Sequence, residues 1–253
     1  MKTNTAKAKL KAGGTLFGCF VRYPQASLIE VLGYYPWDFL LADAEHGTIQ
    51  PADLENMVRA AELRNITSMV RVTTNQPSII LRFMDTGVLG LHVTWVNSAA
   101  EAEAAVRSVK YHPRGIRGLA GVRASDYAQS ISMSDYVQQA NAETMVVLQI
   151  ETADAIDALP EIVKISDIDV VFIGPMDLSQ SLGFPGQPQH PTVQAGMQRI
   201  IDTVVGTDKA LGIMVTNAAA AKEWQQRGAR YIAVGLESLL GPAARDYLKA
   251  ARE

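Results

Sequence analysis

The sequence has little cysteine and no long hydrophobic run. Cys19 is the only cysteine among the 253 residues, so no disulfide can form within the chain, as is usual in a reducing compartment. No apolar run approaches the roughly 20 residues that a membrane span requires. The basic first residues also lack the apolar stretch of about 7–15 residues found in a secretion signal. We therefore expect a cytoplasmic protein without membrane contact, in which Cys19 is a small core residue.

Positive charge is limited as well. The 23 basic and 26 acidic residues give a formal net charge of −3, which argues against a broad basic surface for nucleic acid. No Gly-x-Gly-x-x-Gly or Walker-type sequence follows an apolar run, so nucleotide chemistry is not indicated. No lysine lies at the end of a predicted strand, and a Schiff-base mechanism needs a desolvated lysine in its pocket. Any carbanion chemistry would therefore depend on a metal ion.

The chain does contain a regular alternation of apolar runs and helical patterns. The run Val170–Ile173 ends at Gly174-Pro175, which is typical of a buried parallel strand. Helical spacing separates the runs, and the basic N-terminus resembles a leader or a frayed helix. This alternation predicts a (β/α)8 TIM barrel that fills residues 1–253 as a single domain. The eight predicted strands cover residues 16–21, 38–42, 66–70, 90–96, 145–151, 169–173, 211–215 and 231–234.

Two acidic residues follow neighbouring predicted strands. Glu151 ends one strand, and Asp177 follows the Gly174-Pro175 break of the next. In a barrel both would lie at the carboxyl ends of the strands, where the catalytic face is found. Two carboxylates suit Mg²⁺ or Mn²⁺, with water and substrate oxygens completing the coordination. The alternative is that both carboxylates pair with arginines at the rim.

Other polar residues are predicted on the same face. His46 follows Asp43 and Glu45 after the second strand; it could transfer a proton at neutral pH, or it could be a hydrogen-bonded loop residue. Arg71 ends the third strand, where it could stabilise an enolate or clamp a carboxylate. The alternative for Arg71 is a structural ion pair with Asp43.

Two further segments are candidates for a functional role. Residues 111–131 show neither helical nor strand periodicity of their apolar residues, which indicates a functional loop or a mobile cover. Their arginines could attract an acidic substrate, or could be surface charges or oligomer contacts. The backbone N–H groups of Met176 and Asp177, after the Gly-Pro turn, could form a small anion nest.

Several of these stretches occur together in one known family. The ordered set resembles the HpcH/HpaI aldolase family, whose type member is 4-hydroxy-2-oxoheptanedioate aldolase, over roughly residues 12–250. The matching motifs are Asp43-Ala44-Glu45-His46-Gly47, Val70-Arg71-Val72, Met84-Asp85-Thr86-Gly87, Tyr111-His112-Pro113-Arg114-Gly115-Ile116-Arg117-Gly118, Gln149-Ile150-Glu151-Thr152 and Phe172-Ile173-Gly174-Pro175-Met176-Asp177-Leu178-Ser179.

The resemblance implies a class II pyruvate aldolase on a TIM barrel that uses a divalent metal ion, Mg²⁺, Mn²⁺ or Co²⁺. It implies metal ligands at Glu151 and Asp177, a catalytic base at His46 and an enolate-stabilising group at Arg71. Asp85 matches an acid that pairs with the histidine of a neighbouring subunit. The resemblance also implies a hexamer, a trimer of dimers with exchanged C-terminal helices.

The remaining matches concern the substrate pocket. Gln149 matches a polar pocket residue, and the N–H groups of Met176 and Asp177 match donors to the pyruvate carboxylate. Phe20 stands at the aldehyde end, where the family often has tryptophan. Trp95, Met176 and the loop 119–125 depart from the family pattern, so they bear on the aldehyde partner more than on the reaction type.

The expected reaction is therefore reversible cleavage of a 4-hydroxy-2-oxo acid to pyruvate and an aldehyde. An acyl-CoA lyase of the citrate or malyl-CoA lyase type is an alternative, although no basic patch for the CoA phosphates can be located. A decarboxylase or hydratase with the same enolate chemistry is another. A catalytically silent barrel with a binding role is a fourth possibility, which the full set of acid, base and metal ligands disfavours.

Overall fold

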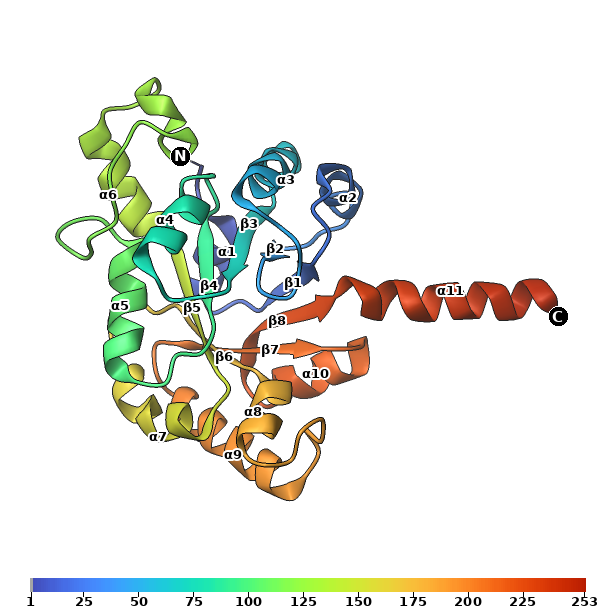
Figure 1. Ribbon diagram of the computed structural model, residues 1–253. Helices are drawn as coiled ribbons and strands as arrows, with labels where there is room; N and C mark the ends of the chain where they lie inside the picture. Colours follow the sequence, from blue (N-terminus) through green and yellow to red (C-terminus); the bar gives the residue numbers. More distant parts are fainter. Residues whose placement is uncertain (1) are drawn as a thin grey trace.

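The computed structural model describes residues 2–253, and these contain a closed barrel of parallel strands in chain order (Figure 1). The barrel closes where β8 pairs with β1, with Leu16 opposite Tyr231. The predicted (β/α)8 fold is therefore confirmed. The eight strands are β1 (Leu16–Val21), β2 (Phe39–Asp43), β3 (Thr67–Val72), β4 (Gly90–Val93), β5 (Met145–Ile150), β6 (Val170–Ile173), β7 (Ala210–Val215) and β8 (Ala229–Gly235).

Helices follow the strands, and most begin at a polar cap. The side chains of Ser98, Thr152 and Asn217 each accept a hydrogen bond from a backbone N–H in the first turn of α5, α7 and α10, which satisfies donors that a helix start leaves unpaired. The helices are α1 (Thr5–Lys11), α2 (Ala26–Leu32), α3 (Pro51–Leu63), α4 (Pro77–Met84), α5 (Ala99–Val109), α6 (Met133–Glu143), α7 (Ala153–Ile162), α8 (Pro175–Ser181), α9 (Pro191–Val204), α10 (Ala218–Gln226) and α11 (Leu236–Arg252), with a 3₁₀ segment η1 (Arg123–Ala128).

The core has two layers, one between strands and helices and one inside the barrel. Aromatic rings fill the interior: Phe39 stacks on Tyr231 with ring centroids 4.2 Å apart. Gly18 makes room for this stack, because a Cβ atom there would lie 2.2 Å from the Phe39 ring. The barrel is thus a packed core, and chemistry is left to its ends.

The N-terminal segment forms helix α1 against the amino-terminal ends of the strands. The Asn4 side chain caps α1 by accepting a hydrogen bond from the Lys7 N–H, and it donates to the carbonyls of Leu89 and Glu143. Leu10 is buried beneath the barrel. The sequence suggested either a leader or a frayed helix here. The structure shows a helix, and these contacts hold it against the barrel, so it is not frayed.

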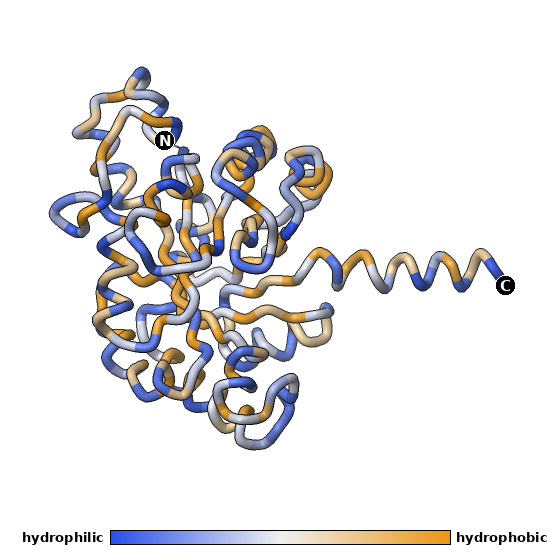
Figure 2. The backbone as a smooth tube through the Cα atoms, in the orientation of Figure 1, coloured by the Kyte–Doolittle hydropathy of each residue, from blue (hydrophilic) through white to orange (hydrophobic). Residues whose placement is uncertain are grey.

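Helix α11 leaves the barrel instead of packing on it (Figure 1). Leu236 is its one buried residue, and hydrophobic and hydrophilic residues alternate along the exposed remainder (Figure 2). On the outer wall of β7, β8 and β1 lies a hollow of about 320 Å³, lined largely by apolar side chains that include Trp37, Val215 and Ile232. No helix in residues 2–253 has the length and hydrophobicity required to cross a membrane.

Some predicted boundaries were wrong. Strand β4 ends at Val93, not at Val96, because the backbone turns into the left-handed region at Trp95, where φ is 56°. Helix α8 was not predicted, and a 3₁₀ segment lies within the irregular stretch 111–131.

Candidate active site

The polar residues predicted at strand ends lie at the carboxyl-terminal mouth of the barrel. Asp43 ends β2, Arg71 lies near the end of β3, and Glu151 directly follows β5. Gln149 lies within β5 and Asp177 in the first turn of α8. Contacts and electrostatic coupling link these side chains into one group, as described below.

Glu151 is the most perturbed acid of this group. It is buried, and its carboxylate accepts hydrogen bonds from the Trp95 N–H at 2.7 Å and from the Gln149 amide. The pKa of Glu151 is raised to about 7, chiefly by burial and to a smaller extent by the neighbouring carboxylates of Asp177 and Glu45, while the two hydrogen bonds act in the opposite direction. Burial and nearby negative charge both disfavour the ionised form of a carboxyl group.

Gly174 supports the position of Glu151. A Cβ atom at Gly174 would lie 2.7 Å from Glu151 Oε2 and 2.8 Å from Gln149 Nε2, both closer than van der Waals contact permits. The missing side chain lets β6 approach the carboxylate from the adjacent strand. Glycine here is required by space, not by backbone conformation.

Arg71 is fixed by an ion pair with Asp43. Its Nε lies 2.9 Å from Asp43 Oδ1 and its Nη2 lies 2.7 Å from Oδ2. Burial alone would raise the pKa of Asp43, but the hydrogen bonds and charge of Arg71 outweigh it, so the pKa is lowered. The structural ion pair considered from the sequence is therefore present. Arg71 Nε also lies 3.2 Å from a carboxylate oxygen of Glu45. The ion pair with Asp43 therefore holds the guanidinium beside a second carboxylate.

His46 lies at the open side of the site. Its side chain is 55% exposed, and its Nε2 is 3.8 Å from a carboxylate oxygen of Glu45. Its backbone N–H donates to Asp43 Oδ1 at 3.2 Å. Glu45 in turn accepts a hydrogen bond from the Thr94 hydroxyl at 2.7 Å. The imidazole is thus accessible to a bound molecule and has an acid beside it.

Asp85 lies elsewhere in the same chain. It follows α4, and its carboxylate forms an ion pair with Arg117 at 3.0 Å. Among the described residues it makes no hydrogen bond to His46. The resemblance assigned this acid to the histidine of a neighbouring subunit, and that assignment stays a prediction.

Aromatic side chains fill the barrel interior beside the site. Phe20 is buried inside the barrel and packs edge-on against His92, with ring centroids 6.0 Å apart, and the Arg71 guanidinium lies over the Phe20 ring, 5.1 Å from its centroid. His92 Nε2 bonds the Gln149 amide oxygen at 2.8 Å, and burial lowers the pKa of His92 to about 3. A neutral His92 therefore orients Gln149. Met176, by contrast, is exposed at the mouth.

Some functional atoms were missed from the sequence. The Trp95 N–H is a backbone donor, which no residue pattern reveals. Arg22 follows β1 and contacts Asp43 at 3.3 Å and Glu237 at 3.8 Å. Arg22 could have been found, because it directly follows a strand in the same way as Glu151.

The donor chemistry fits a hard divalent cation held by few protein ligands. Among residues 2–253, no three histidine, cysteine, aspartate or glutamate side chains gather in a way that would hold a metal ion. Glu151 and Asp177 could offer two oxygen ligands, and the pKa of Glu151 is raised by burial and, to a smaller extent, by the charges of Asp177 and Glu45. Such a pair leaves most coordination positions to water and substrate, as Mg²⁺ sites commonly do.

Comparison with known proteins places the chain in a family. Residues 16–241 match the HpcH/HpaI aldolase/citrate lyase family model. A 4-hydroxy-2-oxo-heptane-1,7-dioate aldolase of Shigella boydii is 36% identical over 98% of this chain and 94% of its own. Two solved structures are similar over nearly the whole chain: a family protein from Burkholderia cenocepacia (31% identity, TM-score 0.93, 99% of this chain and 100% of that one) and an HpcH/HpaI aldolase from Desulfitobacterium hafniense (26% identity, TM-score 0.90, 98% and 96%). The chain therefore belongs to the HpcH/HpaI aldolase/citrate lyase family.

Proposed function

We propose that this protein is a divalent-metal-dependent aldolase that reversibly cleaves a 4-hydroxy-2-oxo acid to pyruvate and an aldehyde. Its curated relatives are named as aldolases and support a carbon–carbon lyase. The observation that carries the proposal is the pair Glu151 and Asp177 beside Arg71. These residues combine a cation-attracting cluster with a fixed guanidinium, the two features that enolate chemistry needs.

The metal would be held by Glu151 and Asp177. When bound, Mg²⁺, Mn²⁺ or Co²⁺ would polarise the keto acid and offset the negative charge that develops on its oxygen. The buried side of the site, where Gln149 and the Trp95 N–H hold Glu151 in place, keeps that ligand in one orientation. A ligand held by neighbouring groups loses little freedom on binding.

The chain's own groups would handle charge and protons. Arg71, locked by Asp43, would stabilise the enolate through a guanidinium that does not need to reorganise. His46 would accept the proton of the substrate 4-hydroxyl during cleavage and return it during addition. The N–H groups of Met176 and Asp177, in the first turn of α8, are the proposed donors to the substrate carboxylate. Phe20 and Trp95 would border the aldehyde.

Removal of one proposed ligand tests the proposal. Asp177→Ala should abolish metal-dependent pyruvate release and pyruvate methyl-proton exchange in D₂O, while the far-UV spectrum stays unchanged. Asp202→Ala, an exposed aspartate on α9, is the matched control and should behave as the wild type. Full wild-type activity in the presence of a strong chelator would refute metal dependence. Proton exchange without cleavage of any 4-hydroxy-2-oxo acid would refute the aldolase assignment.

We also propose that copies of the chain assemble by exchanging α11, in a trimer of dimers. Helix α11 has 17 residues and exposes Leu240, Tyr247 and Leu248 to solvent. The apolar hollow beside Trp37 lies on the barrel wall where a final helix would ordinarily pack. An α11 from a second copy would bury both surfaces, and burial of apolar area is the main driving force of association.

Light scattering tests this assembly. The intact chain should elute as a hexamer, and a variant that ends at Gly235 should lose that state because the exchanged element is gone. Asp85→Ala then tests the shared site, since it should lower turnover although Asp85 contacts no active-site residue in its own chain. A monomeric wild-type protein would contradict the proposal.

A further inference from the structure

A cavity lies at the end of the barrel opposite to the candidate active site. It measures about 620 Å³ and is bounded by α1 and by residues at the amino-terminal ends of the strands. Asp169 precedes β6, Lys209 precedes β7 and Arg230 lies at the start of β8. The aldolase chemistry proposed above uses none of these residues.

The cavity wall carries more positive than negative charge. Three aspartates line it, and each has a cationic partner: Asp167 pairs with Arg114, Asp169 with Lys7 at 3.1 Å, and Asp208 with Lys209 at 2.9 Å. Two more cations line the wall and have no carboxylate partner among the described residues. The five lining cations are Lys7, Lys11, Arg114, Lys209 and Arg230, a formal excess of two positive charges.

Three of the five lining cations have charge or N–H donors left to bind a ligand. Lys11 is exposed at the end of α1 and makes no hydrogen bond or ion pair with another described residue. Arg230 uses one nitrogen to donate to the Leu10 carbonyl at 3.1 Å, which leaves most of its five N–H donors free. Lys209 is buried, and its one carboxylate partner, Asp208, is 80% exposed, so solvent screens that pair.

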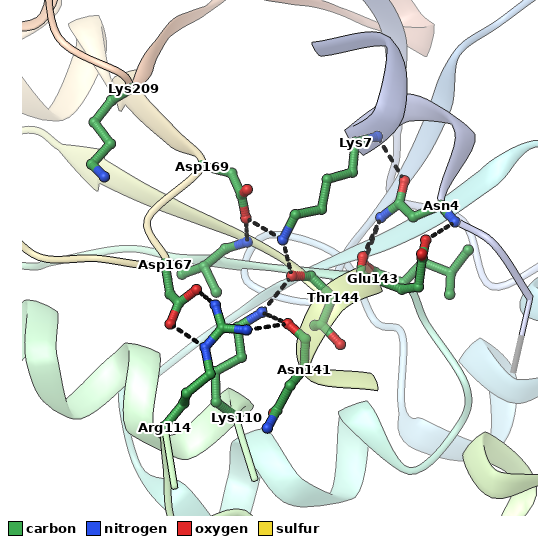
Figure 3. Close-up of polar contacts among 12 residues, drawn as sticks. Asn4, Lys7, Lys110, Arg114, Asn141, Glu143, Thr144, Asp167, Asp169 and Lys209 are labelled. Carbon is green, nitrogen blue, oxygen red and sulfur yellow. Dashed lines mark hydrogen bonds and ion pairs between the residues drawn. The ribbon is translucent and has the colours of Figure 1, made fainter. Parts of the chain in front are cut away.

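A further lysine lies behind the wall. Lys110 is fully buried and donates to the carbonyls of Asn141 at 2.8 Å and Thr144 at 2.7 Å, and it forms no ion pair with a carboxylate among the described residues. Figure 3 shows Lys7 and Lys110 converging on the same Thr144 carbonyl. The pKa of Lys110 is lowered to about 6, chiefly by burial and also by the charge of Lys7, while Asp169 acts in the opposite direction. The positive charge around the cavity is thus high enough to disfavour a further cation, and a bound anion would offset that repulsion.

We propose that this cavity binds a small dianion whose charges lie on oxygen atoms, a phosphate monoester or a dicarboxylate. The charge excess matches two negative charges, and the volume accommodates a metabolite of ordinary size. Lys7 and Lys11 come from α1, whereas Lys209 and Arg230 come from the strand ends. A bound dianion therefore bridges α1 to the barrel and stabilises the native state.

The test measures binding and thermal unfolding at low ionic strength, with inorganic phosphate in one arm and succinate in the other. Sodium chloride at equal ionic strength controls for screening. We expect at least one of the two probes to raise Tm by about 5 °C or more at a hundredfold excess over Kd. A response to phosphate alone assigns the site to phosphoryl groups, and a response to succinate alone assigns it to dicarboxylates.

Variants of the lining residues test whether the probe binds in this cavity. Lys11→Ala with Arg230→Gln should weaken binding of the active probe at least tenfold and leave turnover unchanged. Lys11→Ala alone keeps the test valid if the double variant does not fold, because Lys11 is exposed. Lys164→Ala removes an exposed lysine outside the cavity and should bind as the wild type does. No Tm shift with either probe, or an equal shift in the cavity variants, would overturn the proposal.

Discussion

A single methyl group at Gly174 should disable the candidate active site while leaving the barrel folded. The Cβ atom of Gly174→Ala would lie 2.7 Å from Glu151 Oε2, and an ordinary contact begins near 3.4 Å, so the carboxylate must move by about 0.7 Å. Rotation of the carboxylate alone does not relieve the overlap, because the new Cβ atom would also lie 2.8 Å from Gln149 Nε2 and 2.9 Å from the Glu151 Cβ. A misplacement of about 1 Å in a catalytic group can cost about a hundredfold in rate.

The assay is kcat/KM for pyruvate release, with urea unfolding measured in parallel. A hundredfold loss corresponds to about 2.7 kcal/mol of transition-state stabilisation, whereas overpacking costs the fold about 1–3 kcal/mol. Gly241→Ala is the matched control, because a Cβ atom there meets nothing within 4 Å. Wild-type kcat/KM in the Gly174→Ala enzyme would refute the role assigned to the Glu151 position.

Substitutions at three further positions test separate parts of the structure. His46→Asn should lower turnover about 10²–10⁴-fold with no change in urea midpoint, because the side chain is 55% exposed; unchanged turnover would exclude His46 as the base. Burial lowers the pKa of Lys110 from 10.5 to about 6, so the unfolded chain binds more protons between these values and the free energy of unfolding rises with pH across them. Lys110→Met should flatten that rise in urea unfolding series, and an unaltered slope would contradict the shift. Trp95→Gly keeps the N–H that Glu151 accepts and suits the φ of 56°, so it should retain turnover and admit bulkier aldehydes, whereas Trp95→Pro lacks that N–H and should lose activity.

The strands could be predicted from the sequence because buried parallel strands are continuously apolar and end at turn residues. The exception shows the limit of that rule. The sequence Val93-Thr94-Trp95-Val96 continues the apolar pattern of β4, yet the strand stops at Val93. Trp95 takes a left-handed backbone conformation that residues other than glycine seldom adopt, and its N–H serves Glu151 instead of a neighbouring strand. A tertiary contact thus outweighs local propensity there.

The site could be predicted where function follows position in the fold. Glu151, Asp177, His46 and Arg71 were predicted as site residues because each lies at or just after a strand end, and their functional roles stay predictions. Arg22 meets the same criterion but was not predicted. Helix α8 also had a signal, since Pro175 suits the first position of a helix. The path of α11 had none: its sequence predicts a helix, but only the surrounding surfaces decide whether that helix packs on its own barrel or on another.

At the mouth of the barrel, Glu151 and Asp177 lack the cationic partners that the other acids there have among the described residues. Asp43 is balanced by Arg71 and Arg22, and Glu45 shares Arg71 at 3.2 Å. Within residues 2–253, Glu151 and Asp177 form no ion pair with a lysine, arginine or histidine. Because the arginines are already engaged by the other acids, they cannot compensate this pair without releasing Asp43. A buried carboxylate with a raised pKa beside a second carboxylate therefore requires either a proton or a cation from solution, and a divalent cation satisfies both oxygen groups at once.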